Sequence, residues 1–338
     1  MGTKRVTAAD IARSLGISRA TVGYVLNNTP GQTISQPTRE RVLGEAARQG
    51  YRPNIAAQAL ARGRSRFILL AVPDWPLTSF SMTSGLNAAS QVIDQAGYCP
   101  IVYTFHPDER TRRAWEALDP AAIVCLGLFQ PAELAAMQEW GIGPIVPSPQ
   151  HQRLTADVPS VGDTTRVQVQ HLYDLGHRRL AVATPTNPRV AALGTNRARA
   201  ACHGAAELGL EPPDIRAVNH LDDSAAAAVR QWRDAGITGV VCFNDDIAAT
   251  VIGAALDVKL AVPESLSVVG HDNSPMAALF RPAITSVDLD IAGLAAYLAH
   301  LALHAADGRP LPGPPPEIVA TLHPRATTLP PRETTGPR

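Results

Sequence analysis

Residues 7–27 read TAADIARSLGISRATVGYVLN, a pattern typical of two short helices joined by a tight turn. Thr7 is a favourable N-cap, and Asp10 follows it at the spacing of a capping box. Gly16 can adopt the positive φ that a sharp helix end requires, and Ser18 can then cap a second helix. The spacing predicts a helix-turn-helix, whose second helix enters the DNA major groove. An ordinary helical hairpin inside a larger domain fits the spacing equally well.

The apolar residues around this stretch return at helical intervals. They are Ile11, Ala12 and Leu15 in the first helix, and Val22, Val25 and Leu26 in the second. A third helix is expected from the cap Ser35 to Gly50, with Pro37 in its first turn. Its expected apolar face consists of Val42, Leu43, Ala46 and Ala47. Residues 1–50 would therefore form a small all-α head.

The charge of the chain is unevenly distributed. The whole sequence holds 30 basic and 30 acidic residues, yet residues 1–66 contain eleven Lys and Arg against three Asp and Glu. The rest of the chain carries the compensating acidic excess. A basic segment that coincides with a helix-turn-helix indicates double-stranded DNA as its partner. Without the motif, the same charge would fit a solvated basic face.

The composition also limits the class of protein. At 338 residues the chain is long enough for more than one domain. Its cysteines lie far apart without a C-x-x-C pair, which favours buried free thiols in a reducing compartment over disulfides or a zinc site. There is no apolar signal segment and no apolar run of transmembrane length. We therefore expect a cytoplasmic protein, nucleoid-associated when bound to DNA, with no metal, no cofactor and no membrane contact.

A short segment, residues 51–65, follows the head. Asn54 can cap a helix over Ile55–Arg62, and a helix of about two turns is marginal in isolation. Gly63-Arg64-Ser65 then resembles a flexible linker. We expect this hinge helix to form only when it is packed or bound.

From Arg66 onward, short apolar runs alternate with longer helical stretches, which predicts parallel sheets covered by helices on both faces. Strands are expected at residues 67–72, 100–103, 123–126, 144–146, 180–183, 217–220, 240–243, 266–269, 285–289 and 317–322. Because this body, 66–329, is long for one sheet, we divide it into two α/β lobes. The tail, 330–338, is expected to be disordered.

This order of basic helix-turn-helix, short helix and two-lobed α/β body resembles the lactose-repressor (LacI/GalR) family of bacterial transcription regulators. In the head, the resemblance rests on Val6-Thr7, Asp10-Ile11-Ala12, Gly16-Ile17-Ser18, Thr21-Val22 and Gly50-Tyr51-Arg52-Pro53-Asn54. In the body, it rests on Val72-Pro73-Asp74, Leu175-Gly176-His177, Asn244-Asp245 and Val268-Val269-Gly270-His271-Asp272-Asn273.

The resemblance implies a homodimer that binds a pseudo-palindromic operator and usually represses transcription. It implies hinge helices in the minor groove, where Leu60 of each subunit would wedge between the central base pairs. The body would resemble periplasmic binding proteins, with the chain crossing between its lobes near residues 160 and 288. A small-molecule effector, sugar or nucleoside-like, would bind between the lobes.

The resemblance also implies the residues that contact DNA. These are Thr7, Ser18, Arg19, Ala20, Thr21, Tyr24, Asn27, Asn54, Ala57 and Leu60. Arg19 can pair with guanine, a contact worth ~1–3 kcal/mol in discrimination, or it can contact a phosphate instead. The family commonly has Ser-Arg after Thr-Val, where this chain has Gly23-Tyr24. The operator sequence therefore cannot be carried over from relatives.

Residue-by-residue matching implies effector contacts at Trp75, Phe80, Asp163, Thr195, Arg199, Asn244 and Asp272. Arg199 and the aspartates would hydrogen-bond a polyhydroxylated ligand or a base, and the aromatic rings would stack on it. Trp75 is equally suited to the core or to a dimer contact. Cys202-His203 stands where the family often has Gly-Phe, so the pocket wall is expected to differ.

Rival classes of function fit less of the chain. No G-x-S-x-G, P-loop or strand-linked G-x-G-x-x-G is present, which argues against an enzyme. His300 and His304 have metal-ligand spacing, but Leu301 stands where H-E-x-x-H has glutamate, so solvated helix residues are the better interpretation. A sugar-binding protein of non-regulatory role would leave the basic head unexplained. A DNA-binding regulator without ligand control remains an alternative.

Overall fold

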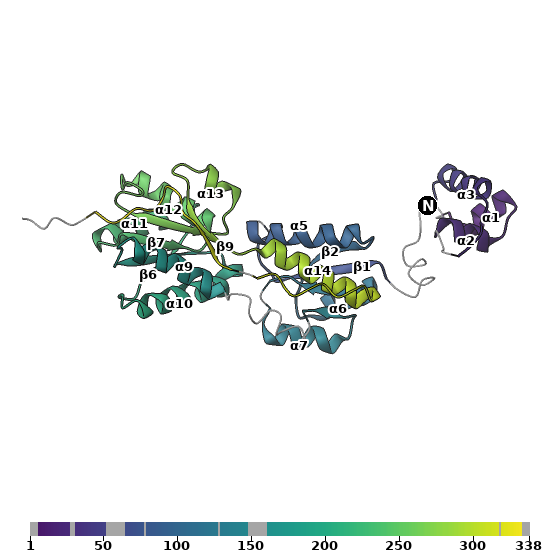
Figure 1. Ribbon diagram of the computed structural model, residues 1–338, viewed down its shortest axis with the longest axis horizontal. Coiled ribbons are helices and arrows are strands. Elements are labelled where there is room, and N and C mark those ends of the chain that lie inside the picture. The colour runs from purple at the N-terminus through teal and green to yellow at the C-terminus, as the bar shows by residue number, and fades with distance from the viewer. Residues whose placement is uncertain are drawn as a thin grey trace, which may run out of the picture. The chain divides into compact units, whose positions relative to one another are not determined.

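The computed structural model describes residues 6–27, 31–51, 65–77, 79–127, 129–147, 161–317 and 319–332, with the side chains of 161–163 excepted. The chain divides after Arg66 into two compact units, here called the head and the body. Figure 1 labels their helices and strands. In the described part of the chain, no helix has both the length and the apolar character needed to span a bilayer.

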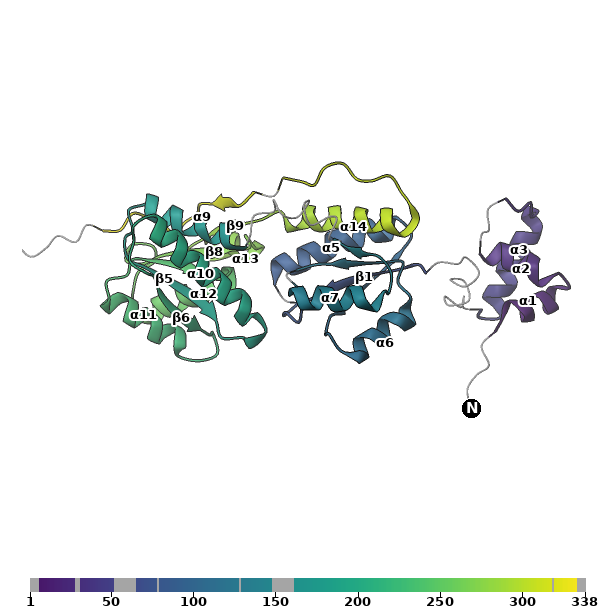
Figure 2. The ribbon, with the colours of Figure 1, turned by 90° about the horizontal axis from the view of Figure 1, so that it is seen from below.

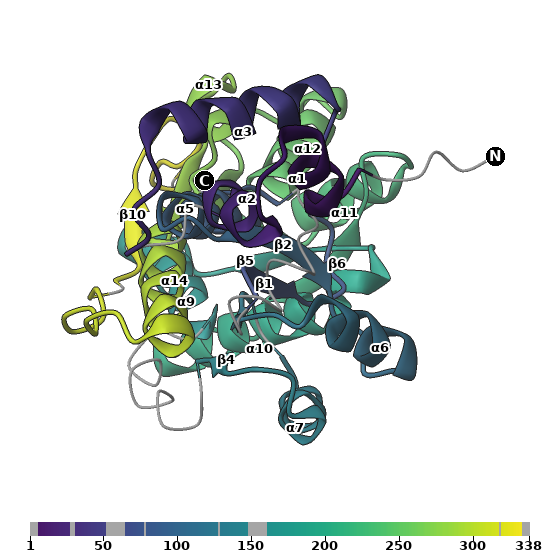
Figure 3. The same cartoon turned by 90° about the vertical axis from the view of Figure 1, so that its right-hand side faces the viewer.

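The head contains the helices α1 (Ala8–Leu15), α2 (Arg19–Leu26) and α3 (Gln36–Arg48), which are grouped in Figure 3. Thr7 and Asp10 form the capping box of α1, and Gly16 ends that helix with φ 65°. The Ser18 hydroxyl accepts a hydrogen bond from the Thr21 amide at 3.0 Å and so begins α2. The head core consists of Ile11, Ala12, Val22, Val25, Val42 and Ala46.

The prediction that Leu43 and Ala47 belong to this core is wrong, because both are exposed, Leu43 by 49%. Val42 and Ala46 are four residues apart and point to the same side of α3, whereas the next residue along a helix turns by about 100°. Leu43 therefore lies beside the buried stripe.

The first lobe of the body is a parallel sheet in the order β2-β1-β3-β4. Its strands are β1 (Phe67–Val72), β2 (Cys99–Thr104), β3 (Ala122–Cys125) and β4 (Ile145–Val146). Alternate residues of β1 pack on opposite faces. Ile68, Leu70 and Val72 face α5 (Phe80–Gln95) and α14 (Ile291–Asp307). Leu69 and Ala71 face α6 (Glu109–Leu118) and α7 (Pro131–Trp140). Figure 2 shows α6 and α7 on the opposite side of this sheet from α5 and α14.

The second lobe is a sheet in the order β10-β9-β8-β7-β5-β6, parallel except for β10. Its strands are β5 (Leu180–Pro185), β6 (Asp214–Val218), β7 (Gly239–Cys242), β8 (Ser267–His271), β9 (Thr285–Asp288) and β10 (Thr321–His323). One face is covered by α9 (Val161–Asp174) and α10 (Ala191–Glu207), and the other by α11 (Ser224–Asp234) and α12 (Asp245–Asp257). The confirmed fold class is therefore a helical head with two α/β lobes.

The chain passes between the lobes three times. It enters the second lobe between β4 and α9, and it returns after β9 into α14, which packs on α5. It then runs back along the body to β10, which pairs antiparallel with β9 (Figure 2). This last passage was not among the predicted crossings. The strand expected at 317–322 corresponds to β10, which begins later, at Thr321.

Three further predictions require correction. The strand expected at 217–220 is β6, which starts earlier at Asp214, because an edge strand with exposed Ile215 and Arg216 lacks a continuous apolar run. Of the four cysteines, Cys99 is exposed and Cys202 only half-buried, so burial holds for Cys125 and Cys242. In the tail, residues 330–332 are described and 333–338 lie outside the described residues.

Candidate functional site

The head presents one exposed face of α2. Ser18, Arg19, Ala20 and Tyr24 are exposed on it, and Thr21 is half-buried beside them. Val22 and Val25 are buried on the opposite side of the helix, against α1 and α3. The N-terminal end of a second helix with this exposure can reach base edges in the major groove.

The other expected DNA contacts are distributed differently. Thr7 is exposed at the start of α1, where its side chain already accepts from the Asp10 amide and donates to the Asp10 carboxylate. Asn27 is the half-buried C-cap of α2. Asn54, Ala57 and Leu60 lie outside the described residues, as does the whole of the predicted hinge helix, 55–62.

The body contains a cavity of about 930 Å³ lined by residues from both lobes. Trp75 follows β1, Leu126 follows β3, Thr186 follows β5, Phe243 follows β7 and Asp272 follows β8. The carboxyl ends of the parallel strands therefore face the cavity. The strand order reverses between β1 and β3 in the first sheet, and between β5 and β7 in the second. Open α/β sheets bind ligands at such reversal points, beside the carboxyl ends of the strands.

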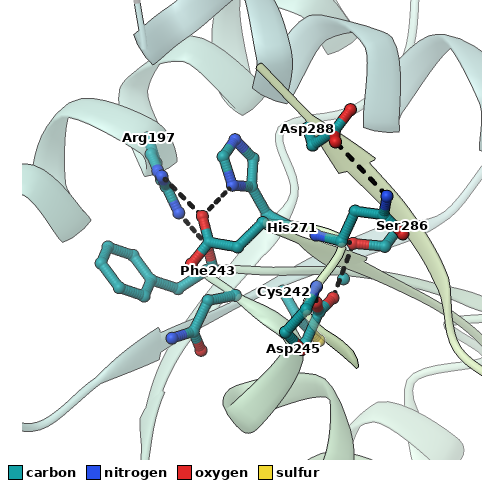
Figure 4. Close-up of polar contacts among 12 residues, drawn as sticks. Arg197, Cys242, Phe243, Asp245, His271, Ser286 and Asp288 are labelled. Atoms are coloured by element: carbon teal, nitrogen blue, oxygen red, sulfur yellow. Dashed lines mark hydrogen bonds and ion pairs between the residues drawn. The ribbon is translucent and has the colours of Figure 1, made fainter. Parts of the chain in front are cut away.

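At the second-lobe side of the cavity, Arg197 and His271 meet at the Asp272 carboxylate. His271 Nδ1 lies 2.7 Å from Asp272 Oδ1, and Arg197 Nη2 lies 3.9 Å from the same oxygen. Arg197 also donates to the Phe243 carbonyl oxygen and stacks over the Phe243 ring at 4.5 Å (Figure 4). These residues are nearly fully buried, apart from half-buried Phe243.

The surroundings of Asp272, His271 and Arg197 determine which of the three side chains carry a charge. Burial and the nearby Arg197 charge lower the pKa of His271 below its ordinary value. Burial opposes ionisation of Asp272, but hydrogen bonding to His271 and the Arg197 charge lower its pKa to about 2. We therefore assign an ionised Asp272, a neutral His271 that donates through Nδ1–H, and a cationic Arg197. The backbone of Asp272 also has a positive φ of 89°. This conformation is held by a hydrogen bond that the Asp272 amide donates to the Val287 carbonyl oxygen.

A second buried carboxylate lies nearby, at the start of α12. Asp245 accepts hydrogen bonds from the Ser286 hydroxyl at 2.6 Å and from the Ser274 amide at 2.7 Å (Figure 4). A Cβ at Gly270 would lie 2.2 Å from Asp245 Oδ1, so this approach requires glycine. Burial raises the pKa of Asp245 to about 6. Asp245 thus links α12 to β9 and to the start of α13 (Pro275–Leu279).

The expected effector residues do not all meet at the cavity. Trp75, Asn244 and Asp272 line it. Trp75 also packs against the first-lobe core, and the Asn244 side chain caps α12 by accepting from the Ile247 amide at 2.9 Å. Phe80 lines a smaller adjoining hollow of about 450 Å³ that Asp272 shares. The side chain of Asp163 lies outside the described set.

Thr195 and Arg199 are placed on the exposed side of α10, away from the cavity lining. The arginine that reaches the cavity is Arg197, two positions earlier, and two residues along a helix point to nearly opposite sides. A sequence signal for Arg197 existed. The buried residues of α10 return at helical spacing and include it among small residues: Gly194, Arg197, Ala198, Ala201, Gly204 and Ala205.

A helix-turn-helix head joined to a two-lobed body with a cavity at its strand ends defines a DNA-binding regulator with a ligand-binding domain. Residues 7–54 match the family described as bacterial regulatory proteins, lacI family, and residues 169–328 match the periplasmic binding protein-like domain. The regulator GalS of Salmonella typhimurium is 30% identical, over 90% of this chain and 91% of its own length. The chain belongs to the LacI/GalR family of transcriptional regulators.

Other relatives agree with this assignment. The regulator GalR of Escherichia coli K12 is 29% identical over 90% of this chain and 91% of its own length. A structure of the lac repressor dimer bound to operator and the anti-inducer ONPF has a TM-score of 0.75 at 23% identity, covering 96% of this chain and 100% of that one. A CelR–cellobiose complex has a TM-score of 0.60 at 22% identity with the same coverage. GalS and GalR are transcriptional regulators, not enzymes, as expected for this chain, and the two solved structures show that the fold is shared.

Proposed function

We propose that the chain is a cytoplasmic repressor whose DNA binding is controlled by a small molecule held between the lobes of its body. The observation that carries this proposal is the cavity at the carboxyl ends of both sheets, lined by both lobes, in a chain that also has a helix-turn-helix head. A ligand that touches two lobes can change their closure, which a ligand confined to one lobe cannot do.

On the DNA side, the working unit is a homodimer that places two heads on a pseudo-palindromic operator. The exposed face of α2 supports this role, because Arg19 and Tyr24 are exposed on it at the side away from the head core. Arg19 reads a base or holds a phosphate. The hinge segment, 51–65, folds on DNA, with Leu60 as the minor-groove wedge.

On the effector side, the ligand is a small hydroxylated molecule, sugar or nucleoside-like, that contacts Asp272, Arg197 and Asn244. Ionised Asp272 offers acceptor oxygens, and the Asn244 amide can still donate while its oxygen caps α12. Effector binding biases lobe closure and thereby the hinge helices, so two distant sites are coupled through one two-state element. The effector induces or co-represses according to the state that it binds better.

The first experiment is capture of genomic fragments on the purified full-length protein, followed by sequencing. Short palindromes should be recovered, and the genes beside them nominate compounds for binding assays. A folded protein that retains no fragment above background at low salt contradicts the DNA-binding proposal, provided that candidate co-repressors also fail to restore retention.

The role of Arg19 separates two modes of contact. If Arg19 reads guanine, Arg19→Ala weakens operator binding by ~1–3 kcal/mol and relaxes specificity at one base pair. If it holds a phosphate, affinity falls for all sequences and the salt dependence decreases by about one charge. Affinity titrations at several salt concentrations, on operator and on unrelated DNA, distinguish the two. Unchanged binding in both would remove Arg19 from the interface.

Arg197 and Arg199 form a matched pair for the effector site. Arg197→Ala should abolish the thermal stabilisation given by the effector, whereas Arg199→Ala should retain it, since a ligand at 100 times its Kd stabilises by about 2.7 kcal/mol. Operator affinity without effector serves as the control for folding. The opposite order of effects would move the site to the exposed side of α10. If no compound nominated by the captured genes stabilises the wild-type protein, regulation without ligand control becomes the better account.

A further inference from the structure

The second-lobe sheet parts between β7 and β8 at its carboxyl end. The pairing of these two strands ends at Val241 and Val269. Beyond that point Cys242 remains paired with β5, and Gly270 remains paired with β9. Where two strands separate, the backbone carbonyl groups lose the donors that the neighbouring strand supplies. A buried carbonyl without a donor is costly, so the parting requires a donor from elsewhere in the fold.

The side-chain amide of Gln168, in the middle of α9, spans this parting. Gln168 is 1% exposed. Its Nε2 donates to the Cys242 carbonyl oxygen of β7 at 3.0 Å. The same nitrogen donates to the carbonyl oxygens of Gly270 at 2.7 Å and Val269 at 3.4 Å, both on β8. Because an amide nitrogen carries two donors, Gln168 can hold both strand ends at once.

The opposite face of the parting is filled by Asp245 of α12. Its carboxylate approaches Gly270 so closely that a Cβ there has no room. Asp245 binds Ser286 of β9 and the Ser274 amide, and so restrains segments beside and after β8. Gln168 instead restrains the ends of β7 and β8 themselves. The amide from α9 and the carboxylate from α12 therefore have different roles at this point of the sheet.

The two strand ends lead directly into the wall of the large cavity. Asn244 follows Cys242 by two residues, and Asp272 follows Gly270 by two residues. Both Asn244 and Asp272 line the cavity. A change in the separation of the strand ends therefore changes the separation of these two side chains.

We propose that Gln168 is a positioning residue. By bridging β7 and β8, it fixes the spacing at which Asn244 and Asp272 are presented to the cavity. This inference rests on the proposed function, which assigns both residues to the effector. The bridge acts through the backbone of the two strands, so Gln168 itself need not touch a ligand.

Gln168→Met tests the bridge, because methionine has a similar length and volume but no donor. In the full-length protein, hydrogen exchange should accelerate about tenfold or more in peptides covering residues 242–246 and 269–273, because the released strand ends open locally. Exchange in α14 should not change. Wild-type exchange at the strand ends, or an acceleration spread evenly over the second lobe, overturns the inference.

Gln170→Met is the matched control on the same helix. Gln170 is exposed, and its amide donates to Asp174 at 2.7 Å on the surface of α9. This variant should leave exchange at both strand ends at the wild-type rate. Acceleration there in Gln170→Met as well would mean that any loss of an amide from α9 loosens the sheet, which contradicts a specific bridge. Gln168→Leu replaces Gln168→Met if the latter does not fold.

The ring of His271 gives a second measurement, which a role in filling volume alone would not affect. His271 Nδ1 lies 2.7 Å from the Asp272 carboxylate, at the end of β8 that Gln168 holds. In protein labelled with ¹⁵N-histidine, the ring N–H signal of His271 is assigned by its loss in His271→Gln. It should persist in Gln170→Met and broaden or disappear in Gln168→Met. An unchanged signal in Gln168→Met would show that Gln168 does not position Asp272.

These measurements use neither DNA nor an effector, which keeps the two proposals apart. Unchanged exchange and an unchanged His271 signal remove the role of Gln168 and leave the regulator proposal standing. Failure to capture palindromic DNA removes the regulator proposal and leaves the bridge between β7 and β8.

Discussion

Single residues of the site illustrate how position decides role. Arg197 and Arg199 lie on one helix, but the former is 8% exposed and stacked on Phe243, while the latter is exposed and contacts only Asn196 at 3.3 Å among described partners. An arginine buried among small residues of α10 is stabilised because the Phe243 carbonyl oxygen accepts a hydrogen bond from it and the Asp272 carboxylate supplies an opposite charge 3.9 Å away. The spacing of residues along α10 does not by itself show that Arg197 meets Asp272 and Phe243.

Asp245 should make folding stability depend on pH. Its folded pKa of about 6 lies above the ordinary 3.8, so the folded state binds the proton more tightly. The stability that protonated Asp245 adds to the folded state is therefore fully present below about pH 4 and is lost as the pH rises through 6. We expect the wild type to lose up to about 3 kcal/mol of unfolding free energy over this range relative to Asp245→Asn.

The Asp245→Asn variant is suited to this comparison because an amide can accept from the Ser274 amide and donate to the Ser286 hydroxyl. Urea unfolding of both proteins between pH 4 and 8 measures the difference. Parallel stability profiles would show that Asp245 is ionised in the folded state throughout this range.

Gly23→Ala should stabilise the head by roughly 1 kcal/mol. Gly23 lies inside α2, and a Cβ there would meet no atom within 4 Å, so nothing in the head requires glycine. Hydrogen exchange of the α2 amides in the full-length protein should slow by about fivefold, the equivalent of this energy. Exchange in α10 of the body is the internal control. Unchanged or faster α2 exchange would mean that the glycine relieves a strain absent from this structure.

At the scale of elements, the short helix η2 (Pro188–Val190) of the second lobe contacts the first lobe at the edge of the cavity. Its Arg189 lies 2.6 Å from Asp74 Oδ1 and donates to the Trp75 carbonyl oxygen at 3.0 Å, both in the loop after β1. The pair is about half-exposed, so its contribution is ~1 kcal/mol or less. That is enough to bias a lobe-closure equilibrium by about fivefold.

Arg189→Ala should therefore increase opening of the lobes. We expect severalfold faster hydrogen exchange in the peptides that contain residues 74–77 and 187–190, and restoration in the charge-exchanged double variant Asp74→Arg with Arg189→Asp. High salt should produce a similar acceleration in the wild type. If the single variant exchanges like the wild type, this contact does not influence closure.

At the scale of the whole molecule, Leu60 belongs to the stretch of sequence between the three helices of the head and the body, and it lies outside the described residues. Leu60→Ala should weaken operator binding severalfold and leave non-specific, salt-sensitive binding largely intact, because a wedge acts on one site while phosphate contacts act on any DNA. Titrations on operator and on unrelated DNA measure both. Unchanged operator affinity would remove Leu60 from the interface.

The sequence by itself determined the features that depend on neighbouring residues. The capping box of Thr7 and Asp10, the turn at Gly16 and the apolar spacing of Ile11 and Val22 all follow from helix geometry. The alternation of apolar strands and helices likewise predicted the two-lobed α/β class, because buried parallel strands need apolar residues on both faces. Family motifs extended this to regulation of transcription.

Only the tertiary structure decided which side chains meet across long separations. Asp272 joins Arg197 of α10, 75 positions earlier in the sequence, and Asp245 joins Ser286 of β9, 41 positions later. The tertiary structure likewise decided that β10 pairs with β9, and that apolar residues of α7 and α14 line the same cavity. Such contacts follow from how the sheets and helices stack, and no local pattern of charge or hydrophobicity encodes them.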